Sequence, residues 1–261
     1  MKIKLYTLSH DVNILKEIDN NGGQFTAEEY AYTVKKECGE TTYKTKEQLI
    51  REYLYIDYKK LDCLSFLIDR IERNGYKNIL SLGAGPCVLE YLLEMSLPEE
   101  SQLIAADFNE FVVEKAKKFF PQLIVEKFDF QKDDFKSFRT KLDISFDLVI
   151  FFGSAPAMDD QEFIKLFGDL KKNGVKQIID FHAGYMGIKS QIMHGPLNFL
   201  RTNSTIRKWF RKSPCIINGY RGKFHGYGRN RSAIRKLYKR SGLSIKIESS
   251  MGPYEYITIL E

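Results

Sequence analysis

Residues 79–88 read Ile-Leu-Ser-Leu-Gly-Ala-Gly-Pro-Cys-Val. The first four form a short apolar run that is typical of a buried strand, and the two glycines allow the backbone to turn sharply. Residues 88–93 then carry apolar side chains at helical spacing. This stretch predicts a strand, a tight turn and a helix, with backbone amides at the start of the helix open to a ligand.

The same order of strand and helix repeats along the middle of the chain. Apolar runs without polar alternation are typical of parallel strands that helices cover on both faces. Further strands are expected at 103–106, 123–128, 146–152 and 175–181, and helices at 110–119 and 160–172. A helix at 232–241 and β-rich runs at 243–247 and 254–260 follow. The last two runs predict a terminal antiparallel hairpin on a mostly parallel α/β sheet.

The chain is expected to form one α/β domain with two appendages. Residues 1–75 show helical patterns at 26–38 and 46–72 and are interpreted as a helical N-terminal extension or cap. Residues 76–261 form the main domain. Within it, residues 186–229 are longer than an ordinary connection between a strand and a helix, which predicts a lid or substrate-binding insertion.

Composition excludes several classes of protein. The 261 residues are 43% hydrophobic and include 7 prolines, which excludes a disordered or collagen-like chain. Four cysteines are too sparse for a disulfide scaffold and too far apart for a short metal motif, so reduced thiols are expected. No apolar run approaches the roughly 18 residues of a membrane span, and the N-terminus lacks a signal-peptide pattern. A soluble, cytoplasmic protein is therefore expected.

The formal net charge of +6 is unevenly distributed. The 67 residues from Phe181 to Ile247 contain fifteen Lys or Arg and no Asp or Glu. The rest of the chain is net acidic. Such asymmetry indicates a localised surface that attracts anions, and it leaves phosphate, nucleic acid and anionic lipid open as partners.

A carboxylate follows the glycine turn at the end of the next expected strand. Asp107 follows Gly83 by 24 residues, at the end of the next expected strand. A carboxylate at this place could accept hydrogen bonds from ribose hydroxyls. Nucleotide-dependent dehydrogenases use a similar arrangement, but Val88 occupies the position where their motif needs a third small residue, which disfavours a nicotinamide cofactor.

The order of these motifs resembles the class I S-adenosylmethionine-dependent methyltransferases. The resemblance is carried by residues 79–85, Asp107, Asp129-Phe130, residues 146–150 and the final hairpin, and it covers roughly residues 76–184 and 230–261. It implies a Rossmann-like, mostly parallel seven-stranded sheet, S-adenosyl-L-methionine as cofactor and methyl transfer as activity.

The resemblance also implies roles for individual residues. Gly83, Ala84 and Gly85 would face the methionine part of the cofactor, Asp107 would bind ribose and Asp129 would contact adenine. The remaining cofactor neighbours would be Phe108, Phe130, Phe152 and Gly153. Asp129 could instead cap the helix that follows it.

Two residues depart from the family pattern. Ser81 stands where many members carry an acidic residue, and Cys87 replaces the third glycine of their turn. These departures indicate that the methionine end of the cofactor is held differently.

The acceptor side is expected at the loops after the fourth and fifth strands, residues 153–160 and 180–185. His182 is the preferred general base and Tyr185 could orient the acceptor, although a purely structural histidine is the alternative. Asp159, Asp160 and Asp180 could instead bind magnesium, but dispersed acids do not define a metal site, and none is predicted. The loop 153–160 lacks the Asn/Asp-Pro-Pro-aromatic motif of base N-methyltransferases.

The acid-free insertion leaves several partners open. Its aromatic and basic residues fit a clamp for a small anionic acceptor, an RNA-binding stripe, a lipid-facing helix or a simply solvated basic surface. We expect methyl transfer to an O or N atom of a small phosphorylated or carboxylated metabolite. An RNA methyltransferase and a noncatalytic protein with the same fold are the alternatives, and the oligomeric state stays open.

Overall fold

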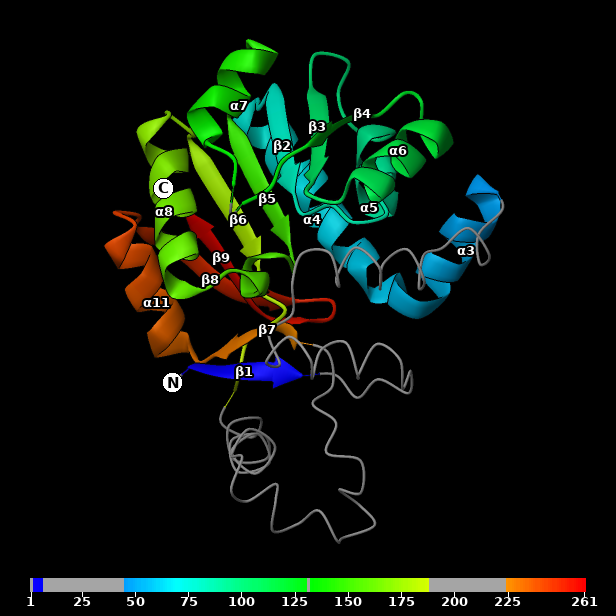
Figure 1. Ribbon diagram of the computed structural model, residues 1–261. Coiled ribbons are helices and arrows are strands. Elements are labelled where there is room, and N and C mark those ends of the chain that lie inside the picture. Colours follow the sequence, from blue (N-terminus) through cyan, green and yellow to red (C-terminus); the bar gives the residue numbers. More distant parts are fainter. Residues whose placement is uncertain (1, 7–44, 131, 188–223) are drawn as a thin grey trace, which may run out of the picture.

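A computed structural model describes residues 2–6, 45–130, 132–187 and 224–261 (Figure 1). The central sheet consists of β2 (Asn78–Leu82), β3 (Gln102–Asp107), β4 (Ile124–Lys127), β5 (Leu148–Phe152), β6 (Gln177–Phe181), β8 (Ile245–Met251) and β9 (Tyr254–Leu260). Their order is β4-β3-β2-β5-β6-β9-β8. Strands β2 to β6 are parallel, and β9 runs antiparallel to both β6 and β8. The predicted Rossmann-like, seven-stranded sheet with a C-terminal hairpin is therefore confirmed.

The parallel strands end nearly level with one another. Leu82 pairs with Ala106, Asp107 with Lys127, and Phe152 with Phe181. This register brings the loops that follow β2, β3, β4, β5 and β6 to one edge of the sheet. That edge is where ligands bind in open α/β sheets.

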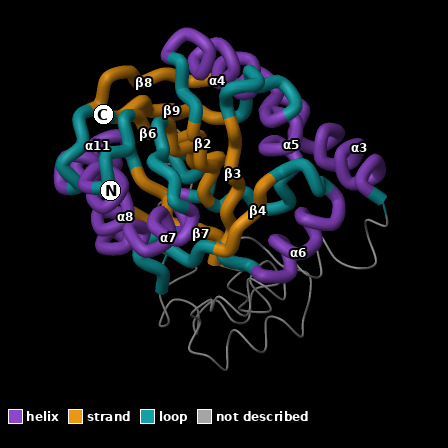
Figure 2. Tube along the Cα trace, turned by 90° about the horizontal axis from the view of Figure 1, so that it is seen from above, coloured by secondary structure: helices purple, strands orange, loops and turns teal. Residues whose placement is uncertain are grey.

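Helices cover both faces of the sheet, as Figure 2 shows from above. One face carries α4 (Leu61–Asn74), α5 (Val88–Glu94) and α6 (Glu110–Phe119), and the other carries α7 (Phe135–Leu142), α8 (Asp160–Lys172) and α11 (Arg231–Arg240). Each layer encloses its own apolar core. Because both faces are buried, the strands can be continuously apolar, as the sequence predicted.

Side-chain caps explain why two helices begin where the sequence predicted. The Asn109 side chain accepts a hydrogen bond from the amide of Phe111 at the start of α6. Asp159 and Glu162 form a reciprocal capping box at the start of α8. Both caps satisfy amides that have no partner inside the helix.

The N-terminal extension differs in part from expectation. The single helix expected at 46–72 is divided into α3 (Lys46–Asp57) and α4, with the 3₁₀ turn η1 (Tyr58–Lys60) between them. The division lets α4 bury its apolar face in the core, whereas α3 contacts α5. The helix expected at 26–38 lies outside the described residues.

A second, two-stranded sheet joins segments that lie far apart in the sequence. Strand β1 (Lys2–Tyr6) pairs antiparallel with β7 (Phe224–Arg229). Figure 1 shows this pair near the edge where β5 and β6 end. The extension is therefore not purely helical, and the last part of the 186–229 insertion is a strand. Most of that insertion, 188–223, lies outside the described residues.

In the part of the chain that the structure describes, no helix is both long enough and apolar enough to cross a bilayer.

The hairpin turn between β8 and β9 packs tightly against η1. A Cβ atom at Gly252 would lie 2.3 Å from the carbonyl oxygen of Lys59, whereas one at Gly174 would meet no atom within 4 Å. Both glycines have positive φ angles, +55° and +81°. The two positions therefore separate the effect of packing from that of backbone strain.

We predict that Gly252→Ala lowers the free energy of unfolding more than Gly174→Ala does. Strain from the left-handed backbone costs about 1–2 kcal/mol at each site, and the collision with Lys59 adds about 1–3 kcal/mol at Gly252. Urea denaturation of both variants measures the difference. Equal losses would show that η1 does not pack against the hairpin.

Candidate functional site

The glycine turn is bonded directly to the end of the neighbouring strand. The amides of Gly83 and Ala84 donate to the carbonyl oxygen of Ala106 over 2.8 and 3.1 Å. The amide of Gly85 donates to Oδ2 of Asp107 over 2.9 Å. Strand β3 therefore supplies the partners of these three amides, whereas the open amides were expected at the start of the helix, α5, which begins at Val88.

Asp107 lies beneath the turn with 6% of its surface exposed. Its Oδ1 accepts the amide of Asn109 over 3.0 Å, while Oδ2 accepts Gly85. Burial raises the pKa of this carboxyl, and the hydrogen bonds from backbone amides oppose that effect. An ionised carboxylate has about four acceptor positions, so Asp107 can still accept a hydrogen bond from a hydroxyl group of a ligand.

Cys87 adopts a backbone conformation that usually favours glycine. Its φ angle is +57°, in the left-handed region, and its side chain is fully buried. This conformation costs a residue other than glycine about 1–2 kcal/mol. The thiol donates to the carbonyl oxygen of Gly85 over 3.4 Å, and burial raises its pKa well above the usual value.

A buried carboxyl group lies beside Ser81, where the sequence pattern lacked one. Glu90 of α5 is 1% exposed, and its Oε1 accepts a hydrogen bond from the Ser81 hydroxyl over 2.7 Å. Burial raises the pKa of Glu90 to about 7, and Asp107 contributes to the increase. Glu90 was not predicted as a site residue; its signal in the sequence is a single acid among the apolar residues of 88–93.

Three loops converge on Gly83. A Cβ atom there would lie 2.3 Å from the Cβ of Ser154 and 3.4 Å from the ring of Phe130. Ser154, which the sequence analysis did not single out as a binding residue, donates its hydroxyl to the carbonyl oxygen of Leu82 over 2.6 Å. The loops after β2, β4 and β5 therefore meet where no side chain can fit at position 83.

The other expected cofactor neighbours lie along the same edge. Phe108 is half-buried directly after Asp107, and Asp129 lies 3.5 Å from the Lys132 ammonium group. Asp134, not Asp129, caps α7, so the alternative role of Asp129 as the cap of that helix is wrong.

The end of β5 packs against the end of β6. Phe152 stacks on Phe181 with ring centroids 4.9 Å apart. A Cβ atom on Gly153 would lie 3.1 Å from that of Ala183. All the residues expected to bind the cofactor thus occupy the carboxyl ends of neighbouring strands.

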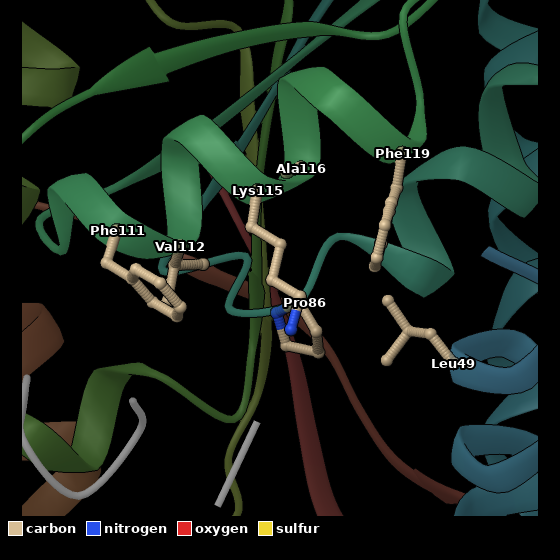
Figure 3. A pocket seen from close by; sticks show the side chains of 7 residues that line it. All are labelled: Leu49, Pro86, Phe111, Val112, Lys115, Ala116 and Phe119. Atoms are coloured by element: carbon tan, nitrogen blue, oxygen red, sulfur yellow. The ribbon is translucent and has the colours of Figure 1, made fainter. Parts of the chain in front are cut away.

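An apolar pocket adjoins this site on the outer side of the turn (Figure 3). Its walls come from α3, the turn and α6, and consist of Leu49, Pro86, Phe111, Val112, Lys115, Ala116 and Phe119. Figure 3 shows the Lys115 side chain extending towards the Pro86 ring. None of the expected cofactor-binding residues lines the pocket, so it neighbours the glycine turn without forming the expected cofactor site.

His182 forms a buried pair with Asp180. Its Nδ1 lies 3.0 Å from Oδ2 of Asp180, and both side chains are fully buried. Its Nε2 has no hydrogen-bond partner among the described residues. The pair lies on the side of the sheet covered by α8 and α11, because Asp180 also contacts Tyr238 of α11.

Tyr185 and Arg229 hold the neighbouring loops. The ring of Tyr185 stacks on Tyr256 with centroids 4.9 Å apart. Arg229, which is fully buried, donates to the carbonyl oxygen of Met158 over 2.7 Å and to the Asp160 carboxylate over 2.9 Å. Arg229 thereby connects the loop after β5 to β7.

The three acids that were considered as magnesium ligands have other partners. Asp159 caps α8, Asp160 pairs with Arg229, and Asp180 binds His182. Within residues 2–6, 45–130, 132–187 and 224–261, no group of three or more His, Cys, Asp or Glu side chains is placed to hold a metal ion.

We predict that Glu90→Gln stabilises the protein at alkaline pH. The pKa of Glu90 is about 7 in the folded protein and near 4.5 in the unfolded chain. Because the folded-state value is raised, its contribution to stability is full below pH 4.5 and is lost as the pH rises to about 7. Removing this titration should raise the free energy of unfolding at pH 8 by about 1–3 kcal/mol, with little gain at pH 4.5.

Urea denaturation at pH 4.5 and pH 8 measures this effect. Glu100→Gln removes an exposed carboxylate and serves as the control. If Glu90→Gln and the control show the same dependence on pH, Glu90 does not titrate as a buried acid.

Neither a protein-family model nor a curated protein sequence matches this chain. Solved structures match at low sequence identity. DesVI of Streptomyces venezuelae is 9% identical, and 84% of this chain aligns with 99% of DesVI at a TM-score of 0.53. NcsB1, an O-methyltransferase from neocarzinostatin biosynthesis, was solved with S-adenosyl-L-homocysteine and 1,4-dihydroxy-2-naphthoic acid. It is 12% identical, and 78% of this chain aligns with 54% of NcsB1 at a TM-score of 0.51.

The mitomycin 7-O-methyltransferase MmcR is 14% identical, with 72% of this chain and 49% of MmcR aligned at a TM-score of 0.48. This chain thus spans about half the length of NcsB1 and of MmcR. At these identities the likeness concerns the fold. The chain has the fold of the class I S-adenosylmethionine-dependent methyltransferases, as the resemblance in its sequence predicted.

Proposed function

We propose that this protein is an S-adenosylmethionine-dependent methyltransferase. The observation that carries the proposal is the hydrogen bond between the Gly85 amide and the Asp107 carboxylate, at the carboxyl edge of the parallel sheet. It places a sharp glycine turn and a buried acceptor side by side. The complex of NcsB1 with S-adenosyl-L-homocysteine supports the choice of cofactor.

The residues at this edge fit such a cofactor chemically. Asp107 has an acceptor position left for a ribose hydroxyl, and Phe108 and Phe130 offer apolar surfaces to adenine. Gly83 keeps the surface of the turn free of a side chain, because a Cβ atom there would collide with Ser154. When bound, the cofactor supplies an electrophilic methyl group.

The chain's own contribution on the acceptor side is to position the acceptor and to take its proton. His182 has one nitrogen tied to Asp180 and the other without a described partner, which suits a neutral base. The proton would move from an acceptor hydroxyl or ammonium group to Nε2. Tyr185, stacked on Tyr256, would fix the acceptor beside it.

A small acceptor is the class that we propose. NcsB1 was solved with a small aromatic carboxylic acid, and the acid-free run 181–247 favours an anionic group on the acceptor of this chain. RNA is the alternative acceptor. A methyl-donor assay against phosphorylated metabolites, carboxylic acids and RNA, after mass spectrometry for copurified cofactor, identifies the class.

We predict that Asp107→Asn weakens the binding of S-adenosyl-L-homocysteine at least tenfold. The amide retains one acceptor oxygen but loses the charge, and hydrogen bonds to a charged group contribute about 1.5–3 kcal/mol each. Titration calorimetry measures the affinity, and Asp69→Asn, an exposed acid on α4, is the control. Unchanged affinity in a folded variant would remove Asp107 from the cofactor site.

We predict that His182→Ala slows methyl transfer about 100-fold or more while the affinity for S-adenosyl-L-homocysteine stays within twofold of the original. Loss of a general base typically costs this factor in rate and leaves cofactor contacts in place. Single-turnover kinetics and calorimetry separate the two effects. Unaltered turnover would show that His182 is only structural.

A further inference from the structure

Tyr238 connects the last helix of the domain to the His182–Asp180 pair. Its hydroxyl donates to Oδ2 of Asp180 over 2.6 Å and accepts a hydrogen bond from the Thr258 hydroxyl over 2.8 Å. Tyr238, Asp180 and Thr258 are all fully buried. One chain of hydrogen bonds therefore connects three separate elements, β9, α11 and β6.

The chemistry of the groups sets the direction of these hydrogen bonds. An ionised carboxylate only accepts, so the single hydroxyl hydrogen of Tyr238 points to Asp180. Thr258 must then donate to the oxygen of Tyr238. At the same carboxylate, His182 can donate only from a protonated Nδ1, which leaves the lone pair of a neutral ring on Nε2.

We propose that Tyr238 is a positioning residue that holds Asp180 so that His182 presents Nε2 as the proton acceptor. The functional part of this inference rests on the proposed methyl transfer. The hydrogen-bond order itself does not, because it follows from the buried groups alone.

The proposed step transfers one proton from the acceptor to His182. The acceptor's O–H or N–H bond breaks, an Nε2–H bond forms, and the Nδ1 hydrogen stays on His182. The resulting imidazolium is paired with the Asp180 carboxylate in a region of low dielectric, where such a pair is strengthened. Asp180 keeps its charge throughout and receives no proton.

The surroundings make Tyr238 the main constraint on Asp180. Oδ1 of Asp180 has no hydrogen-bond partner in the described part of the chain, so the carboxylate is held only through Oδ2. Phe163 and Phe167 of α8 pack against the Tyr238 ring with centroids 5.5 and 5.6 Å away. On β9, the other hydroxyl nearby belongs to Tyr256, which donates to Glu248. Without Tyr238, the carboxylate is expected to rotate.

The test is the tautomer of His182, read from its ring nitrogens by NMR in protein without added cofactor or acceptor. His182→Gln assigns the signals. In the original protein, and in Tyr256→Phe, we expect a single tautomer with hydrogen on Nδ1 at pH 8. Tyr256→Phe is the matched control, because it removes a nearby tyrosine hydroxyl that is bonded to Glu248. In Tyr238→Phe we expect a mixture of the two tautomers.

A single Nδ1–H tautomer in Tyr238→Phe, or the same mixture in the Tyr256→Phe control, would overturn the inference. If Tyr238→Phe does not fold, Thr258→Val is the second test. It frees the Tyr238 hydroxyl to reorient, so we expect a mixture of His182 tautomers with a smaller share of the Nε2–H form than in Tyr238→Phe. An unchanged tautomer there overturns the inference as well.

Kinetics then separate this inference from the proposed function. In Tyr238→Phe we expect kcat to fall about tenfold or more, with KM and cofactor affinity nearly unchanged. Failure of the original protein to bind S-adenosyl-L-homocysteine would refute the proposed function and leave the NMR result standing. An unaltered tautomer alongside intact cofactor binding would refute only the role of Tyr238.

Discussion

The hydrogen bond from the Gly85 amide to the Asp107 carboxylate ties the end of β2 to the end of β3. It forms because the two strands are parallel neighbours whose carboxyl ends lie level. The carboxylate also accepts the amide of Asn109, which in turn caps α6. One buried side chain therefore fixes the turn, the start of a helix and the acceptor position that faces a ligand. Any change in the register of β2 on β3 would separate all three.

The region beneath the turn concentrates ionisable groups in an apolar setting. Cys87, Glu90 and Asp107 are all buried, and each acid raises the pKa of the thiol. Hydrogen bonds from the backbone amides of Gly85, Phe108 and Asn109 offset the burial of Asp107, whereas Glu90 relies mainly on the Ser81 hydroxyl. A ligand that favours one charge state of these acids would therefore also change the free-energy cost of burying the others, which links ligand binding here to stability.

Local patterns in the sequence were sufficient for the seven strands of the central sheet, for α6 and α8, and for the pairing of the glycine turn with Asp107. What they could not supply was contact between distant residues. Strand β1 pairs with β7 across more than 200 positions, and Tyr238 reaches Asp180 across 58. For the same reason, the sequence did not predict the hydrogen bonds from the amides of the turn to β3. A pattern of glycines indicates that a turn is possible but does not indicate what its amides bind.

The basic residues of the acid-free run 181–247 fall into two groups, those that form ion pairs within the domain and those that do not. The two acids that flank it both contact it: Asp180 binds His182 and Tyr238, and Glu248 binds Arg231 and Arg235. Arg229 donates hydrogen bonds to the carbonyl oxygen of Met158 and to the Asp160 carboxylate. Part of the basic excess therefore holds α11 and β7 onto the domain. Other bases of the run, such as the exposed Lys236 and Lys239, remain as candidates to attract the anionic acceptor that we propose. Only bases that do not hold α11 or β7 onto the domain can be replaced to test charge recognition without disturbing the fold.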